Sequence, residues 1–121
     1  MINLKPTIYE LLYDAIPIDR DQINTSYPQD WSVFPIVQFT EEQNKTHIKC
    51  DGKERIAYFR YRIDIWDEVS TTDLSIEVDN AMTSIGFERT SSIDITEPNG
   101  LEHKVIRYEG YLNVETFTVY Q

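Results

Sequence analysis

Residues 51–67 read DGKERIAYFRYRIDIWD and decide the fold, because they join a tight turn to a long strand with two different faces. Asp51-Gly52 is a strong signal for a two-residue β-hairpin turn. Beyond the turn, successive side chains of a strand point to opposite faces of the sheet. One face is apolar and is expected to lie in the core: Ala57, Phe59, Tyr61, Ile63 and Ile65. The opposite face carries Tyr58, Arg60, Arg62, Asp64 and Trp66.

The strand before the turn has a register problem. Val37 and Phe39 alternate with polar neighbours, which predicts a strand that pairs with residues 55–67. A plain two-residue turn would place Phe39 opposite Asp64, and a slip of one residue moves every side chain to the other face. We therefore predict a β-bulge within residues 41–49, or a looser turn, that returns Val37 and Phe39 to the core face.

Apolar spacing and breaker residues predict two helices around this hairpin. The first lies between Pro6 and Pro17, with apolar residues on one helical face: Ile8, Leu11, Leu12, Ala15 and Ile16. The second starts with a capping box at Ser70-Thr71-Thr72-Asp73 and ends at Gly86. It places one apolar stripe toward the core: Leu74, Val78, Ala81, Met82 and Ile85.

The remaining segments complete the predicted layout. Residues 18–35 form a long loop with one short strand near residues 22–27, and strands follow at residues 87–95 and after Gly100. We predict one α+β domain over residues 1–121. It has an antiparallel sheet of four to five strands and two helices packed on one face.

Composition limits the classes of partner. The formal net charge of −10 disfavours general binding of nucleic acid, which is itself a polyanion. No segment approaches the ~20 apolar residues that a membrane span requires, and the first residues lack the apolar region of a signal peptide. A single cysteine, Cys50, fits a reducing compartment. We expect a soluble protein made in the cytoplasm, with no membrane partner.

No residue pattern predicts a catalytic or metal site. His47, Cys50 and His103 give three possible zinc ligands, whereas a structural zinc site normally has four. No serine or cysteine stands in a nucleophile motif with a base. The acidic doublets Glu41-Glu42 and Asp67-Glu68 point to opposite faces of a strand and do not form a catalytic pair. We expect no enzyme activity, no metal and no cofactor.

Aromatic residues outside the predicted core are the feature that favours a function. Two helices and a small sheet cannot easily cover them all, and Tyr and Trp are enriched at protein interfaces. Packing beneath the long loop is the alternative. The predicted interface set combines these aromatic residues with the charged face of the hairpin: Tyr27, Trp31, Phe34, Tyr58, Arg60, Arg62, Trp66 and Tyr120.

Several motifs follow one another in an order that resembles the tail-completion family of long-tailed bacteriophages, also called tail terminators or tail-to-head joining proteins. The last third carries Ser84-Ile85-Gly86-Phe87, Arg89-Thr90 and residues 103–110, HKVIRYEG. Earlier matches are residues 2–9, INLKPTIY, then Tyr27-Pro28 with Asp30-Trp31, then residues 35–41 and residues 51–66. The resemblance covers nearly the whole chain.

The resemblance implies a structural virion protein without catalytic residues or cofactor. Such a subunit assembles into a hexameric ring on the head-proximal end of the tail tube. The ring stops tube growth and presents a surface to the neck. The implied partners are copies of the chain itself, the tail tube protein and a neck or connector protein. DNA passes through the ring without specific binding, and the implied location is the head–tail junction of the virion.

A lumen that passes DNA suits an acidic wall, since like charges prevent the DNA from sticking. Candidate lumen-facing acids come from the hairpin and from the turn near residue 97: Glu41, Glu42, Asp51, Glu54, Asp94 and Glu97. The loops at residues 18–34 and 43–53 are expected to be mobile in the free subunit and ordered in the ring. Whether the free subunit is a monomer or a ring is open at this point.

Three rival functions remain open at this point. Another neck or head-completion protein, such as a stopper or adaptor, differs from a terminator mainly in its partner. An acidic module that mimics DNA requires carboxylates spaced like phosphates, whereas here they are interleaved with basic residues. A small hydrolase requires a nucleophile and a base, and the sequence shows no such set.

Overall fold

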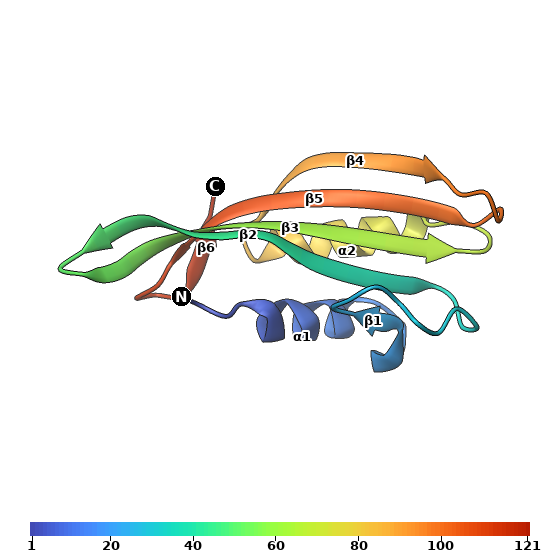
Figure 1. Cartoon of the computed structure of the whole chain (residues 1–121), viewed down its shortest axis with the longest axis horizontal. Coiled ribbons are helices and arrows are strands. Elements are labelled where there is room, and N and C mark those ends of the chain that lie inside the picture. Colours follow the sequence, from blue (N-terminus) through green and yellow to red (C-terminus); the bar gives the residue numbers. More distant parts are fainter.

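Two helices and a six-stranded sheet account for most of the chain in the computed structural model, which describes all 121 residues (Figure 1). The helices are α1 (Lys5–Ala15) and α2 (Thr72–Ser84), and a 3₁₀ turn, η1, spans Arg20–Gln22. The architecture is one α+β domain, as the sequence predicts. The strands in chain order are β1 (Ile23–Asn24), β2 (Ile36–Cys50), β3 (Lys53–Asp67), β4 (Glu88–Thr96), β5 (Glu102–Asn113) and β6 (Thr118–Tyr120).

The sheet differs from the prediction in strand number and in direction. Its order is β1-β2-β3-β5-β4, and β6 pairs with β5 beyond the end of β4. The sheet is mixed rather than antiparallel, because β1 runs parallel to β2, with Ile23 beside Val37. Strands of two or three residues such as β1 and β6 are too short to show a period of two in the sequence. They form because the fold brings β1 beside β2 and β6 beside β5, where the longer strand has no other partner on that side.

The register of β2 against β3 confirms the predicted bulge. Val37 pairs with Ile65 and Phe39 with Ile63, so both side chains lie on the core face. The register shifts between Glu41 and Gln43, inside the predicted range, with two further irregularities nearer the turn. Asp51 and Gly52 form the tight turn with φ of 53° and 75°, the left-handed conformation that this hairpin type needs.

Both helices pack on the same face of the sheet. Ile8 and Leu12 of α1 and Val78 and Met82 of α2 join one buried cluster of 18 residues. The face of β3 predicted to be apolar supplies the centre of that cluster: Ala57, Phe59, Tyr61, Ile63 and Ile65. A sheet whose long strands are antiparallel can be covered on one face and open on the other, and this sheet is of that kind.

The start of α2 corrects one expectation. No side-chain capping bond forms there, because Thr71 already has helical backbone angles (φ −99°, ψ −2°). The hydroxyl of Ser70 instead accepts a bond from the amide of Thr72 at 3.2 Å. A capping box forms elsewhere, at η1, where the side chains of Asp19 and Gln22 bond reciprocally to backbone amides.

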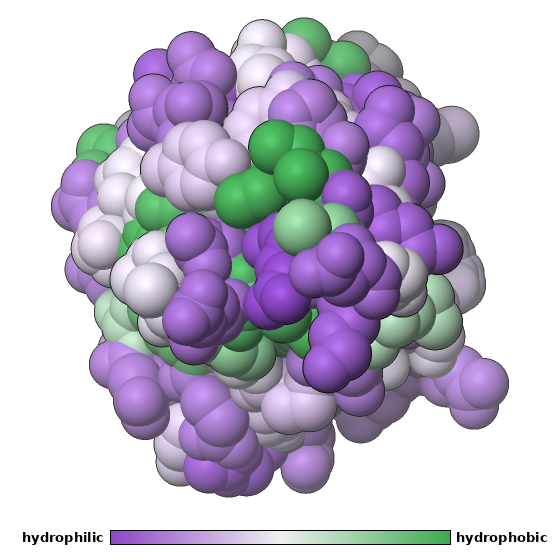
Figure 2. Space-filling model, turned by 90° about the vertical axis from the view of Figure 1, so that its left-hand side faces the viewer, coloured by the Kyte–Doolittle hydropathy of each residue, from purple (hydrophilic) through white to green (hydrophobic).

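The hairpin of β2 and β3 extends past the other strands, to the left in Figure 1. Strand β5 pairs with β3 only from Ile56 onward, so the hairpin is two-stranded over residues 47–55. Together with Lys45 and Thr46 at its base, this segment is called the arm, residues 45–55. Every residue of this arm except Glu54 is exposed. Figure 2 views the molecule from that end and shows a mainly hydrophilic face with an apolar patch near its centre. An isolated two-stranded hairpin is marginally stable in water, so the arm depends on its attachment to the sheet.

The junction between α2 and β4 requires glycine. Gly86 has φ of +110° and ends the helix, and a β-carbon built on it would collide with the backbone carbonyl of Val119 in β6. Two backbone hydrogen bonds close the turn: the amide of Gly86 donates to the carbonyl of Thr83, and the amide of Phe87 donates to the carbonyl of Met82. The close approach of β6 and the predicted left-handed C-cap therefore depend on the same residue.

We expect Gly86→Ala to lower the free energy of unfolding by more than the roughly 1–3 kcal/mol that a strained backbone conformation alone costs. Gly100→Ala is the matched control, since Gly100 has φ of +82° but open space around it. Urea denaturation of both variants separates strain from collision. Equal losses in the two variants would show that the contact with β6 contributes nothing.

Two fully buried tyrosines connect the helix-covered face to carboxylates. The hydroxyl of Tyr61 donates to Glu41 at 2.9 Å, and that of Tyr108 donates to Asp79 of α2 at 3.0 Å. Burial, and then the neighbouring carboxylate, raise the pKa of both phenols above the ordinary value of 10.0. Both groups therefore favour the folded state only while they remain protonated.

The pH dependence of stability follows from these shifts. Below about pH 10 both phenols are protonated in folded and unfolded chains, so their contribution is fully present. Above this pH the unfolded chain ionises first, and stability falls by about 1.4 kcal/mol per pH unit for each phenol. The double variant Y61F/Y108F should be less stable at neutral pH but lose stability less steeply under alkaline conditions. Denaturant titrations across this range test the difference in slope, and identical slopes would contradict it.

Candidate functional site

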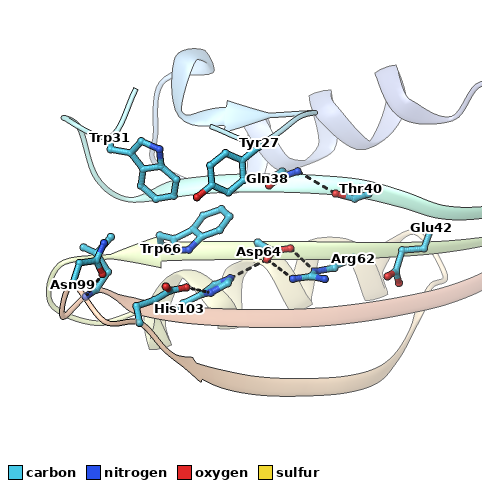
Figure 3. A pocket seen from close by; sticks show the side chains of 12 residues that line it. Tyr27, Trp31, Gln38, Thr40, Glu42, Arg62, Asp64, Trp66, Asn99 and His103 are labelled. Carbon is cyan, nitrogen blue, oxygen red and sulfur yellow. Dashed lines mark hydrogen bonds and ion pairs between the residues drawn. The ribbon is translucent and has the colours of Figure 1, made fainter. Parts of the chain in front are cut away.

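The face of the sheet opposite the helices contains a groove of about 620 Å³ (Figure 3). Its floor is built by β2, β3 and β5, which contribute Gln38, Asp64 and His103 among others. Tyr27 and Trp31, from the loop between β1 and β2, hang over one side. Asn99 and Leu101, from the turn between β4 and β5, close one end. The long loop is therefore what converts an open sheet face into a groove.

An aromatic corner anchors this loop to the sheet. Trp31 meets Trp66 edge-on with ring centroids 5.2 Å apart, and Tyr27 lies 5.6 Å from Trp31 and 6.3 Å from Trp66. Trp66 also stacks on His103, its neighbour across the β3–β5 pair, at 4.5 Å and 22°. The indole of Trp31 donates to the carbonyl of Pro28 at 2.9 Å, which fixes its own loop. These rings form a small second core on the helix-free face.

His103 and Asp64 are the two buried ionisable residues of the groove, with 6% and 4% of each residue exposed. Nε2 of His103 lies 2.9 Å from Oδ2 of Asp64, and its Nδ1 lies 2.6 Å from Oε1 of Glu97. Each ring nitrogen therefore faces a carboxylate oxygen, and neither points freely into the groove.

Arginine side chains form ion pairs with the carboxylates of Asp64 and Glu42. Arg62 binds Asp64 through two parallel bonds of 2.8 and 3.0 Å, and these raise the pKa of the guanidinium above its usual value. Glu42 lies 3.1 Å from Nε of Arg107 and 3.3 Å from Nε of Arg60. The middle of the face is thus a network in which acids and bases from β2, β3 and β5 alternate.

Tyrosines cover the end of the face toward the arm. Tyr111 of β5 lies 5.4 Å from Tyr58 of β3 and stacks at 5.7 Å on Tyr120 of β6. His47 of the arm contacts Tyr111 at 4.7 Å. Partial burial, followed by hydrogen bonding to Glu109, raises the pKa of Tyr58 to about 12. The helix-free face therefore carries aromatic clusters at both ends and ion pairs between them.

Seven of the eight predicted interface residues come together on this face. Tyr27, Trp31 and Trp66 form the aromatic corner, Arg60 and Arg62 belong to the ion-pair network, and Tyr58 and Tyr120 flank Tyr111. Phe34 is half-buried in the loop before β2 and is not part of these pairs. The two alternatives for the aromatic residues were an interface and packing beneath the long loop. Trp31 and Trp66 pack together at the loop, whereas Tyr27 and Tyr120 are exposed.

The six predicted lumen-facing acids do not form one surface. Glu42 and Glu97 belong to the groove, whereas Glu41 bonds to Tyr61 on the helix-covered side. Asp51 and Glu54 lie on the arm, and Glu54 accepts a bond from Thr46 at 2.6 Å. Asp94 is exposed on β4, 3.4 Å from Lys104. An acidic lumen stays a prediction and would have to be assembled from several subunits.

The structure separates the possible zinc ligands found in the sequence. His47 and Cys50 lie on the arm, while His103 lies in the groove, and no group of three or more ligands is arranged around a common point. No pattern of neighbouring residues in the sequence could predict that His103 lies between Asp64 and Glu97, because residue 64 comes close to residue 103 only through the pairing of β3 with β5. Tyr111, one of the aromatic residues outside the predicted core but not in the predicted interface set, lies between Tyr58 and Tyr120.

Comparison with models of known protein families and with curated protein sequences finds no match to this chain. Neither helix has the length and apolar character needed to cross a bilayer. The geometry of the helix-free face is therefore the main basis for inferring a function.

Asp64→Asn should lower the free energy of unfolding by about 1–3 kcal/mol, since the buried carboxylate accepts bonds from both His103 and Arg62. Asp94→Asn is the matched control, because this side chain is 77% exposed in its pair with Lys104 and should change stability by less than about 0.5 kcal/mol. Urea denaturation measures both. A loss for Asp64→Asn as small as for the control would show that the network around His103 does not stabilise the fold.

Proposed function

We propose that this protein is a structural subunit of a long-tailed bacteriophage and acts as the tail terminator. Copies of the chain form a ring, of six subunits by the family resemblance, on the head-proximal end of the tail tube. The ring stops tube growth and provides the surface on which the neck assembles. DNA later passes through the ring, and no cofactor or chemical step is involved. The order of sequence motifs along the chain supports the family, and the geometry supports an assembly role.

The observation that carries the proposal is the helix-free face of the sheet. It is rich in Tyr, Trp and Arg, the residue types enriched at protein interfaces. No helix covers it, although a helix covers the other face along most of the sheet (Figure 1). Its charges are already paired within the chain, so a partner can dock without first removing isolated charges from water.

The same geometry disfavours the rival classes. A hydrolase needs a base with a free nitrogen or oxygen beside a nucleophile, but both nitrogens of His103 face carboxylates. The groove is lined by neither serine nor cysteine. A DNA mimic needs a row of free carboxylates, whereas Glu42 and Asp64 on this face are paired with arginines. A stopper or adaptor shares the assembly chemistry and differs in its partner.

Electron microscopy of phage particles that lack this gene tests the function. A terminator predicts DNA-filled heads beside detached tails of abnormal, overgrown length. Detached tails of normal length would instead assign the protein to the joining step and support a neck component. Intact virions would exclude both assembly roles.

Complementation with variants tests whether the helix-free face is the functional surface. Tyr120→Ala should leave the isolated protein folded but restore fewer normal-length tails than the wild-type gene. Phe117→Ala is the matched control, because Phe117 is similarly exposed (50% against 43% for Tyr120) but lines a hollow beside the end of α2. Tail lengths measured in micrographs give the readout. Equal restoration by the two variants would argue that this end of the face makes no contact in the tail.

A further inference from the structure

Charge is distributed unevenly along the long axis of the molecule. The arm, residues 45–55, holds four of the eleven basic residues (Lys45, Lys49, Lys53 and Arg55) but only two of the 21 acidic ones (Asp51 and Glu54). Its formal charge is therefore +2, which leaves −12 on the rest of the chain. An acidic protein thus presents its one basic projection on an arm that has no core of its own.

The opposite end of the molecule combines acidic residues with the mouth of the groove. Asp67 at the end of β3 pairs with Glu102 at the start of β5, and the exposed Glu68 follows directly. The turn between β4 and β5 adds Glu97, which lines the groove. Figure 1 shows this turn and the loop between β1 and β2 at the end of the sheet away from the arm.

Each end of the molecule also exposes apolar or aromatic side chains. The arm exposes Ile48, with 48% of the residue accessible, beside Lys49. At the groove, Tyr27 is 69% exposed and stands over an opening of about 620 Å³. A hairpin tip with an isoleucine and flanking lysines is complementary to a groove with an aromatic wall and carboxylates at its margin.

We propose that the arm of one copy docks into the groove at the acidic end of a second copy. This inference deepens the proposed function, because it assigns the contact through which copies join into a ring. The contact is heterologous: each copy contributes an arm on one side and a groove on the other. Such contacts close into a ring when the rotation between copies allows it. The arm cannot fill the groove of its own chain, since the two lie at opposite ends of the sheet.

The net charge explains how this contact is restrained in free protein. Two copies that each carry −10 repel at long range, but salt at physiological strength screens this repulsion beyond roughly 8 Å. An approach of the arm to the acidic end places opposite charges together. Association is therefore weak, specific in direction and sensitive to salt, and it strengthens when a tail end holds several copies side by side.

The chain provides its own probe for the experiment. Cys50 is its only cysteine and is exposed on the arm next to the turn. A benzophenone maleimide attached there should, on illumination, link two copies. The linked peptides should map to residues 27–31 and 97–103 of the second copy. Mixing isotopically labelled with unlabelled protein shows by mass spectrometry that the link joins different molecules.

Charge variants test the direction of the contact. K49E/K53E on the arm should lower the yield of linked dimer by about tenfold or more at low salt. K5E/R89E changes the net charge equally at exposed residues away from the arm and should have little effect. E68K/E102K at the acidic end should also fail to self-link. A mixture of K49E/K53E with E68K/E102K should recover linked dimers, because each variant supplies the charge that the other has reversed.

Three results would overturn the proposal: no intermolecular link in the wild-type protein at low salt, links scattered over the surface, or full linking by K49E/K53E. Cross-links from Cys50 to added duplex DNA in place of a second copy would show that the arm binds nucleic acid instead. The tail function is judged separately by tail length. Overgrown tails without an arm-to-groove link would support the terminator function and exclude this contact. An arm-to-groove link with tails of normal length would support the contact and exclude the terminator function.

Discussion

The register between β2 and β3 is the constraint on which the rest of the structure depends. The bulge after Glu41 adds one residue to β2, and this places Phe39 beside Ile63 and Val37 beside Ile65 on the helix-covered face. Without it, these two apolar side chains would face the groove and polar neighbours such as Gln38 would enter the core. The same residue count sets the length of the arm and directs Glu42 toward Arg60 and Arg107. One local irregularity thus organises both faces of the sheet.

The two faces of the sheet are stabilised by different kinds of contact. The helix-covered face uses apolar contact, with phenol hydroxyls of Tyr61 and Tyr108 directed to carboxylates at its margin. The helix-free face uses pairing instead: Trp66 stacks on His103, and Asp64 binds both His103 and Arg62. Buried charges are tolerated when they are paired and hydrogen-bonded, as Asp64 is here, while Nε of Arg60 is paired with Glu42 at 3.3 Å without a hydrogen bond. This face is consequently stable in water and still chemically suited to contact.

Shape and charge are consistent with the assembly role proposed above. The arm and the open face offer aromatic, apolar and charged groups at positions that another chain can reach. In the contact proposed above, an arm without its own core gains stability when it docks. A ring built from heterologous contacts needs two different surfaces on each subunit, and the arm and the groove are the two that we propose.

The sequence alone determined the elements whose periodicity is local. The Asp51-Gly52 turn, the two helices, the apolar face of β3 and the need for a bulge all follow from the order of neighbouring residues. It also indicated which residues share the helix-free face, because alternation along β3 puts Tyr58, Arg60, Arg62 and Trp66 together. Only the tertiary structure decided how that face is built. The pairing of β3 with β5 brings His103 to Asp64, the folded loop brings Trp31 to Trp66, and the shorter reach of β5 leaves the arm uncovered. These contacts join residues far apart in the chain, so no local pattern can encode them.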